Sequence, residues 1–122
     1  MGVVARYFQR LASIVGRRQA TPPAVSADVR GLDIGTHRVL WSEVHRLYAF
    51  KRDIFVGDCI CLAILAADDR LFEINETSPG WKEAGNAIER FLPGSLPNAE
   101  WTLRLMAVKP GESVEIYRSG MA

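Results

Sequence analysis

The stretch that decides the fold reads RVLWSEVHRLYAFKRD at residues 38–53, CICLAIL at 59–65 and LFEINE at 71–76. All three parts are rich in apolar and aromatic residues, a composition typical of strands. The tetrapeptide SPGW at 78–81 then places serine, proline and glycine before an amphipathic pattern, which predicts the start of a helix. Three extended segments followed by one helix predict a small α+β domain.

Alternation within these segments predicts which side chains are buried. The 59–65 run is apolar on both faces, so we expect it to be the most buried strand. In the strand before it, Tyr48 and Phe50 are expected to point to one face, and Leu47 and Ala49 to the other.

Residues 24–44 precede that strand and predict two short strands and a tight turn. Apolar and polar residues alternate over 25–34, and Gly31 and Gly35 interrupt the alternation. Two short strands joined by a turn are therefore expected. Trp41 stands at a tight link into the next strand, and we expect it to be buried against the sheet.

Charged and glycine residues predict the turns. Lys51, Arg52 and Asp53, together with residues 57–58, predict a loop, and we take these three residues as a candidate ligand loop. Residues 68–69 are two consecutive aspartates, which predict a hairpin turn with an antiparallel return.

The helix that begins near residue 78 carries the clearest signals. Thr77 or Ser78 can cap it, Pro79 suits the first helical position, and Pro93-Gly94 ends it. Its apolar stripe is typical of core packing rather than of a ligand site. The stripe consists of Trp81, Ala84, Ile88 and either Phe91 or Leu92.

Residues 98–108 fit two structures. A helix capped by Asn98 would place Trp101 and Leu105 on one face, whereas a strand would alternate the same apolar residues. The content of alanine, leucine, methionine, arginine and glutamate favours the helix. Residues 114–117 predict one last short strand.

The two cysteines, Cys59 and Cys61, lie two positions apart in a predicted strand, so both leave on the same face. This spacing is awkward for a disulfide, and no second pair of metal ligands accompanies it. We expect both to be small core residues, and we expect no metal and no cofactor. A reduced, cytosolic compartment is consistent with this usage.

The charge distribution is uneven. Residues 1–27 contain four arginines and no acid, whereas the rest of the 122-residue chain has 11 basic and 14 acidic residues, a balance of −3. Binding to nucleic acid needs clustered lysine and arginine, so we do not expect a nucleic-acid partner.

Residues 1–23 predict a basic amphipathic helix followed by a linker that contains Thr21-Pro22-Pro23, and residues 24–122 form the predicted domain. A secretory signal and a membrane span are excluded because arginines interrupt the apolar residues. Myristoylation at Gly2 is excluded because position 6 is arginine. The candidate interaction surface of this helix consists of Val4, Tyr7, Phe8, Leu11 and Val15, flanked by Arg6 and Arg10.

Several roles for this helix remain open. Its apolar face can dock on the domain or on a second copy of the chain, so self-association or a protein partner is expected. It can instead lie on a membrane surface, which would make the protein a peripheral membrane protein. An acid-free, arginine-rich start also suits a transit peptide.

The order of these segments resembles that of bacterial pleckstrin-homology-like (PH-like, GRAM-related) domains over residues 24–92. The matching parts are residues 39–44, with a Trp-x-x-Val step into a strand, residues 51–53, residues 72–74 and residues 80–81. The resemblance implies a curved antiparallel sheet or partial barrel plugged by one helix. It also implies a binding module for lipids, peptides or partner proteins, without catalysis.

An enzyme is not expected. His37 and His45, with Asp33 and Glu43, are the general-base candidates that cluster in sequence. The chain has no nucleophile elbow, no glycine-rich phosphate loop and no metal-ligand spacing.

An immunity-type or inhibitor protein that neutralises a basic partner is the alternative. Such a protein would need an acidic face. The candidates for that face are Asp53, Asp58, Asp68, Asp69, Glu73 and Glu76.

Overall fold

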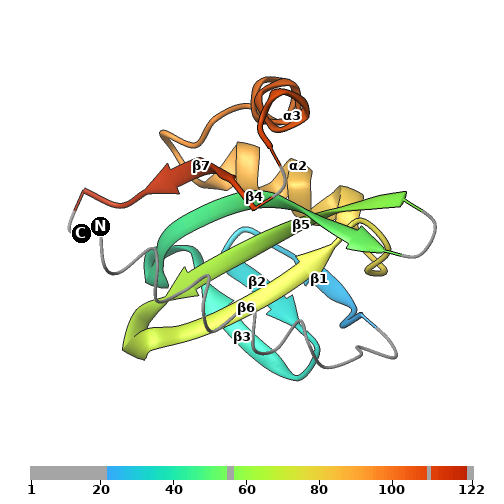
Figure 1. Cartoon of the computed structure of the whole chain (residues 1–122). Helices are drawn as coiled ribbons and strands as arrows, with labels where there is room; N and C mark the ends of the chain where they lie inside the picture. The colour runs from blue at the N-terminus through green and yellow to red at the C-terminus, as the bar shows by residue number, and fades with distance from the viewer. Residues whose placement is uncertain (1–21, 55–56, 110, 121–122) are drawn as a thin grey trace.

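The computed structural model describes residues 22–54, 57–109 and 111–120, apart from the side chains of residues 53 and 54 (Figure 1). The predicted helix at the N-terminus, with its candidate surface, therefore lies outside the described residues. The elements are β1 (Val25–Ala27), β2 (Gly31–Ile34), β3 (His37–Leu40), the 3-10 helix η1 (Trp41–Glu43), β4 (Val44–Ile54), β5 (Gly57–Ala66), the 3-10 turn η2 (Ala67–Asp69), β6 (Arg70–Asn75), α2 (Trp81–Phe91), α3 (Asn98–Ala107) and β7 (Ser113–Arg118).

The predicted α+β class is confirmed. The strands form two antiparallel sheets, of order β1-β2-β3 and β6-β5-β4-β7, and neither sheet closes on itself. Figure 1 shows α2 behind the four-stranded sheet, on the side where the three-stranded sheet also lies. This arrangement leaves the main core between the two sheets and α2.

Strand β5 is the most buried strand, as predicted. It is an inner strand of the four-stranded sheet, and every residue from Cys61 to Ala66 is buried. The predicted alternation in β4 is also confirmed, because Leu47 and Ala49 belong to the main core whereas Tyr48 and Phe50 belong to a second cluster on the opposite face.

The loop predicted at Lys51, Arg52 and Asp53 is wrong. Strand β4 continues to Ile54, β5 begins at Gly57, and Asp53 is paired with Asp58. Charged residues and glycine have low strand propensity. Here, however, each of these residues extends an antiparallel ladder that the apolar residues further along both strands have already aligned, so pairing outweighs propensity.

The turn predicted at Asp68 and Asp69 is confirmed, and β6 returns antiparallel to β5. Both aspartates have positive φ, 64° and 57° respectively. Aspartate adopts this left-handed region more readily than most residues, which explains why two aspartates serve at the tip.

The start of helix α2 differs from the prediction. Its N-cap is Gly80, at φ 86°, and neither Thr77 nor Ser78 caps it. The Ser78 hydroxyl instead accepts a hydrogen bond from the Asn75 amide. The cause is tertiary, because the amide of Val25 in β1 donates to the Pro79 carbonyl at 2.8 Å and so fixes the chain before the helix.

Residues 98–107 form helix α3, so the favoured alternative is confirmed and the strand is excluded. The predicted cap is wrong, because Pro97 is the N-cap and Asn98 is the first helical residue. The last predicted strand is confirmed as β7, which pairs antiparallel with β4 at the edge of the sheet.

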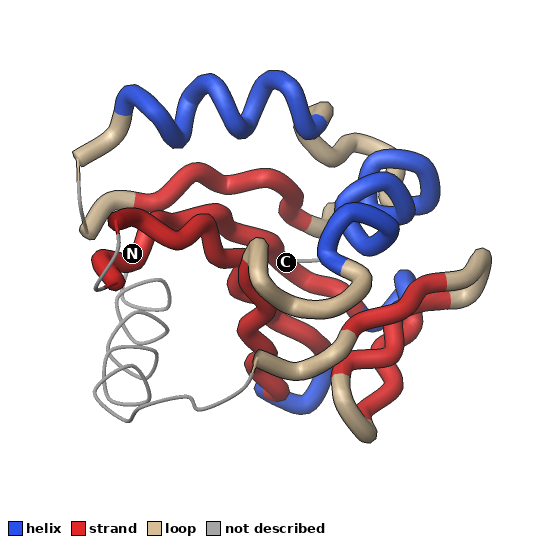
Figure 2. The backbone as a smooth tube through the Cα atoms, turned by 90° about the vertical axis from the view of Figure 1, so that its right-hand side faces the viewer, coloured by secondary structure: helices blue, strands red, loops and turns tan. Residues whose placement is uncertain are grey.

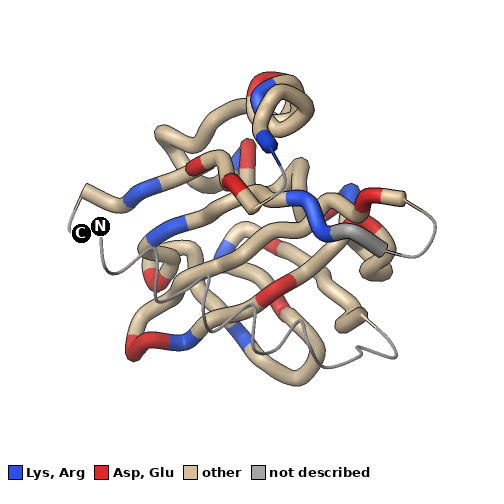
Figure 3. Tube along the Cα trace, in the orientation of Figure 1, with Lys and Arg blue, Asp and Glu red and all other residues tan. Residues whose placement is uncertain are grey.

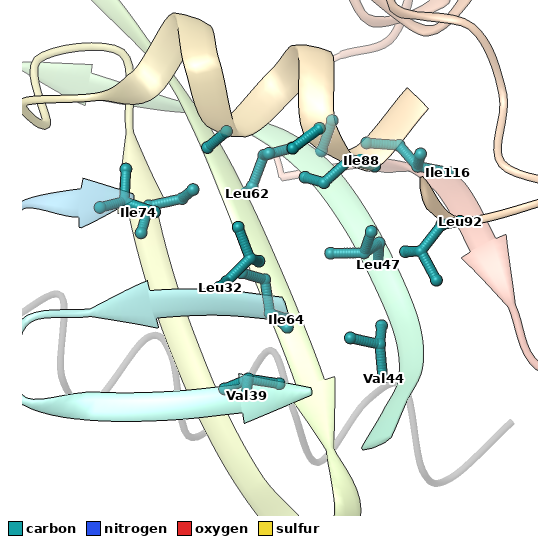
Figure 4. Close-up of a cluster of buried hydrophobic side chains, with 14 of the residues drawn as sticks. Leu32, Val39, Val44, Leu47, Leu62, Ile64, Ile74, Ile88, Leu92 and Ile116 are labelled. Carbon is teal, nitrogen blue, oxygen red and sulfur yellow. The ribbon is translucent and has the colours of Figure 1, made fainter. Parts of the chain in front are cut away.

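The main core joins side chains from both sheets and from α2 and α3 (Figure 4). Trp41 is buried in it, as predicted, with 8% of its surface exposed. Its largest fully buried side chains are those of Leu32, Val39, Val44, Leu47, Leu62, Ile64, Ile74, Ile88 and Leu105. Within the described residues, no helix is both long and apolar enough to cross a membrane.

Candidate functional site

A groove of about 290 Å³ lies between helices α2 and α3, with strand β5 as its floor. Figure 2 shows the two helices at the same side of the molecule, joined by a short connection. The residues that line the groove are Ile60, Leu62, Trp81, Lys82, Gly85, Asn86, Asn98, Trp101 and Thr102.

The side chain of Asn98 holds the two walls together. Its amide nitrogen donates to the Gly85 carbonyl of α2 at 3.1 Å, and its amide oxygen accepts from the Trp101 indole at 3.0 Å. A Cβ added to Gly85 would meet the Asn98 side chain at 3.7 Å, an ordinary van der Waals contact, so this approach does not require glycine. Asn98 therefore fixes both the helix spacing and the direction of the Trp101 ring.

The two tryptophans contribute differently to the groove. Trp101 is buried, with 5% of its surface exposed, and acts as a fixed wall. Trp81 is only half-buried and packs against the edge of the main core. We expected Trp81 to be buried in the core as a member of the apolar stripe, but it is the first residue of α2 and is only half-buried.

Two polar groups on α2 stand at the rim. The Lys82 ammonium and the Asn86 side-chain amide are exposed, and no hydrogen bond or ion pair to another described residue engages either of them. The groove can bind a ligand that has an apolar group next to an acceptor oxygen. The apolar floor and the two indole rings would contact the apolar group, and the cation and the amide would donate to the oxygen.

The structure does not bring the candidate ligand residues together. The Lys51 ammonium donates to the Val108 carbonyl at 3.2 Å, whereas Arg52 forms an ion pair with Glu73 on the other face of the sheet. The Asp53 side chain lies outside the described part. Successive residues of a strand point to opposite faces, so this segment cannot present one cationic pocket.

The Arg52–Glu73 pair is poorly hydrated. Only 5% of the Glu73 side chain is exposed, and its second carboxylate oxygen and the Arg52 Nε atom are buried without a hydrogen-bond partner among the described residues. Burial raises the pKa of Glu73, and this effect exceeds the opposing attraction of Arg52. Burial likewise raises the pKa of the Cys61 thiol, which lies on the same face, and the Glu73 charge adds to that shift.

This shift gives a testable pH dependence of stability. The folded state holds the Glu73 proton more tightly than the unfolded chain does. The contribution of Glu73 to the free energy of unfolding is therefore fully present below the ordinary pKa of 4.5, and it is lost as pH rises through the raised pKa of the folded state. Glu73→Gln should remove that decline, which urea denaturation at a series of pH values will measure. Exposed carboxylates with a lowered pKa, such as Asp28, affect both proteins equally. An identical slope in the variant and the parent chain would contradict this assignment.

Three of the four general-base candidates make structural contacts, and the fourth, His45, is exposed. Arg38 donates to Asp33 at 2.9 Å, and Glu43 accepts from the Leu40 amide and pairs with Arg70. The His37 ring packs against Phe72 with 5.5 Å between ring centroids. Among the described residues, no three His, Cys, Asp or Glu side chains gather closely enough to hold a metal ion.

The six residues proposed for an acidic face are divided between the two ends of the four-stranded sheet, because Asp53, Asp58 and Glu76 lie at the end opposite to Asp68 and Asp69. Asp68 and Asp69 lie at the β5–β6 turn, Asp58 lies at the opposite end of β5, and Glu73 is buried. Figure 3 shows acidic and basic residues interspersed over the described chain. This distribution is typical of a solvated surface rather than of a face that meets a basic protein.

The sequence did not predict the groove. Its two walls are separated by the 92–97 connection, and each tryptophan reads as an ordinary member of an amphipathic stripe. The glycine at position 85 gives no signal either, because an added Cβ there would make only an ordinary contact with Asn98.

No protein-family model, curated protein or solved structure matches this chain.

Proposed function

We propose that this protein is a non-catalytic binding module with a PH-like fold, and that the groove between α2 and α3 is its binding site. Two antiparallel sheets of three and four strands support the PH-like assignment, as does a helix that follows β6 and packs on the same side of the four-stranded sheet as the three-stranded sheet. The observation that carries the binding site is the pairing of Trp81 and Trp101 over an apolar floor, beside the unengaged groups of Lys82 and Asn86.

The chemistry of the groove favours a short extended peptide of a partner protein. An apolar side chain of the peptide would rest on Ile60 and Leu62 between the indole rings, where burial of apolar area stabilises binding. A main-chain carbonyl or carboxylate of the peptide would accept hydrogen bonds from Lys82 and Asn86. Tryptophan is common among the residues that dominate binding energy at such sites.

Selection from a random peptide library displayed on phage, with the full chain as bait, tests this function. We expect enrichment of peptides with a shared apolar position. Their affinity should fall about tenfold or more with Trp81→Ala, because the ring forms one wall of the site. Lys82→Gln should weaken binding by a smaller factor.

The matched control is Lys109→Gln, which removes another exposed lysine charge at a residue that does not line the groove. It should leave the affinity unchanged, and thermal melting will establish that each variant is folded. A library that yields no enriched peptide would contradict the proposal, as would peptides that bind Trp81→Ala as tightly as the parent chain.

A further inference from the structure

The four-stranded sheet has a second apolar face, on the side away from α2. We call it the outer face and define it by the buried cluster Tyr48, Phe50, Cys59, Cys61 and Ala63, with Leu71 packed against it. These residues come from β4, β5 and β6, and their register places Phe50 beside Cys61 and Tyr48 beside Ala63. The outer face is therefore one continuous surface over three strands.

The burial of the outer face is greater than its described neighbours explain. Only 4% of Tyr48 and 8% of Phe50 is exposed. Within residues 22–54, 57–109 and 111–120, both long helices and the three-stranded sheet pack on the other side (Figure 1). The Arg46 guanidinium reaches the Tyr48 hydroxyl at 3.3 Å, but neighbours within a sheet shield the edges of an aromatic ring more than its flat face. A further cover over this face would explain the burial of both rings.

The Arg52–Glu73 pair gives independent support. It lies on the outer face, and two of its polar atoms are buried with no hydrogen-bond partner in the part of the chain that the structure describes. On an uncovered sheet, water would reach these atoms and satisfy them. The pair is thus dehydrated from the same side as the two aromatic rings.

We propose that the outer face is the docking surface of the chain's own N-terminal segment, residues 4–15. The apolar residues in this segment recur at the spacing of one helical face, and burying them is favourable by about 25 cal/mol per Å². As a helix, 12 residues would extend about 18 Å. Strand β4 from residue 46 to residue 52 extends about 20 Å, so the segment matches the outer face in length.

The tether and the charge both favour this occupant. Residues 16–21 link the segment to the first described residue, Pro22, and six extended residues reach about 20 Å, so the outer face is within range. A tethered segment also has a high effective concentration at its own domain compared with a second copy. The four arginines of residues 1–27 complement the balance of −3 in the remainder.

Disulfide trapping in the full chain tests this docking directly. Cys61 is a natural partner at the centre of the outer face, and Cys59→Ser leaves it as the single native thiol. In this background, a series of Phe8→Cys, Leu11→Cys and Val15→Cys should yield an intrachain disulfide under mild oxidation. Mass spectrometry and non-reducing electrophoresis will identify it in the monomer.

Ser13→Cys is the matched control, since residue 13 is on the side of the predicted helix opposite to Leu11 and has a similar tether. It should cross-link much less. Equal yields from Ser13→Cys and Leu11→Cys would overturn the proposal, and so would disulfide-linked dimers, which would identify a second copy as the occupant. Binding of the full chain to phosphatidylserine-containing vesicles without any intrachain cross-link would overturn it in favour of a membrane surface.

Thiol accessibility provides a second measurement that needs no new cysteine. Leu11→Asp should raise the labelling rate of Cys59 and Cys61 by about tenfold or more, because loss of the cover lets reagent and water reach them. Ser13→Asp adds the same charge and should leave the rate unchanged. Circular dichroism will establish that both variants are folded, and equal rates in the two folded variants would contradict the docking. If Leu11→Asp unfolds the chain, the trapping experiment decides.

Discussion

Trp41→Ala is expected to lower the free energy of unfolding by about 3–5 kcal/mol, as for other large-to-small replacements in a core. Trp41 is buried where the chain enters β4, and its ring packs against Phe91 with 6.1 Å between ring centroids. Its indole nitrogen also donates to the Asp28 carbonyl at 3.0 Å. The replacement would leave a cavity and remove a hydrogen bond that holds the connection between β1 and β2.

Urea denaturation of the full chain measures this loss. Trp81→Ala is the internal comparison, because the same change at a half-buried position should cost clearly less. A loss of under about 1 kcal/mol for Trp41→Ala, or a larger loss for Trp81→Ala, would show that the core is not organised around Trp41.

Gly80→Ala is expected to destabilise the fold by a similar amount, about 3–5 kcal/mol, since it combines backbone strain with overpacking. Gly80 has φ 86°, and an added Cβ would lie 1.8 Å from the Val25 carbonyl oxygen. That oxygen belongs to the backbone of β1, so relief would require the strand to move away from the start of α2.

Gly94→Ala is the matched control. Gly94 also has a positive φ, 90°, but an added Cβ would meet no atom within 4 Å. This variant should lose only about 1 kcal/mol, the cost of a left-handed alanine. Equal losses in the two variants would show that the approach of β1 to Gly80 does not constrain the fold. Thermal and urea denaturation of both full-length variants provide the comparison.

Local pattern was sufficient for most of the elements. The run at 59–65 is apolar on both faces, so it had to be covered twice, and β5 is indeed the most buried strand. The opposite directions of Tyr48 and Leu47 follow from the period of a strand alone. The positive φ of Asp68 and Asp69 suits a residue type that tolerates this region, which is why the hairpin turn could be predicted.

The groove could not be predicted in the same way. Its shape depends on how far apart α2 and α3 lie, and that distance is set by the hydrogen bond from Asn98 to the Gly85 carbonyl across 13 residues. The sequence predicts Asn98 as a helix cap, because asparagine is a common N-cap residue and the hydrogen-bond partner in α2 cannot be recognised from neighbouring residues.

The chain's own sequence determined the α+β class, the identity of the central strand and the positions of the helices, because these depend on periodicity and on neighbouring residues. Only the tertiary structure decided that Lys51 and Arg52 are strand residues on opposite faces, that Gly80 rather than Ser78 is the N-cap of α2, and that Trp81 and Trp101 share a groove. Each of these depends on a partner distant in sequence: β5 pairs with the end of β4, β1 approaches Gly80, and Asn98 joins the two helices. Such contacts outweigh local propensity because each one satisfies backbone or side-chain polar groups that burial would otherwise leave without a partner.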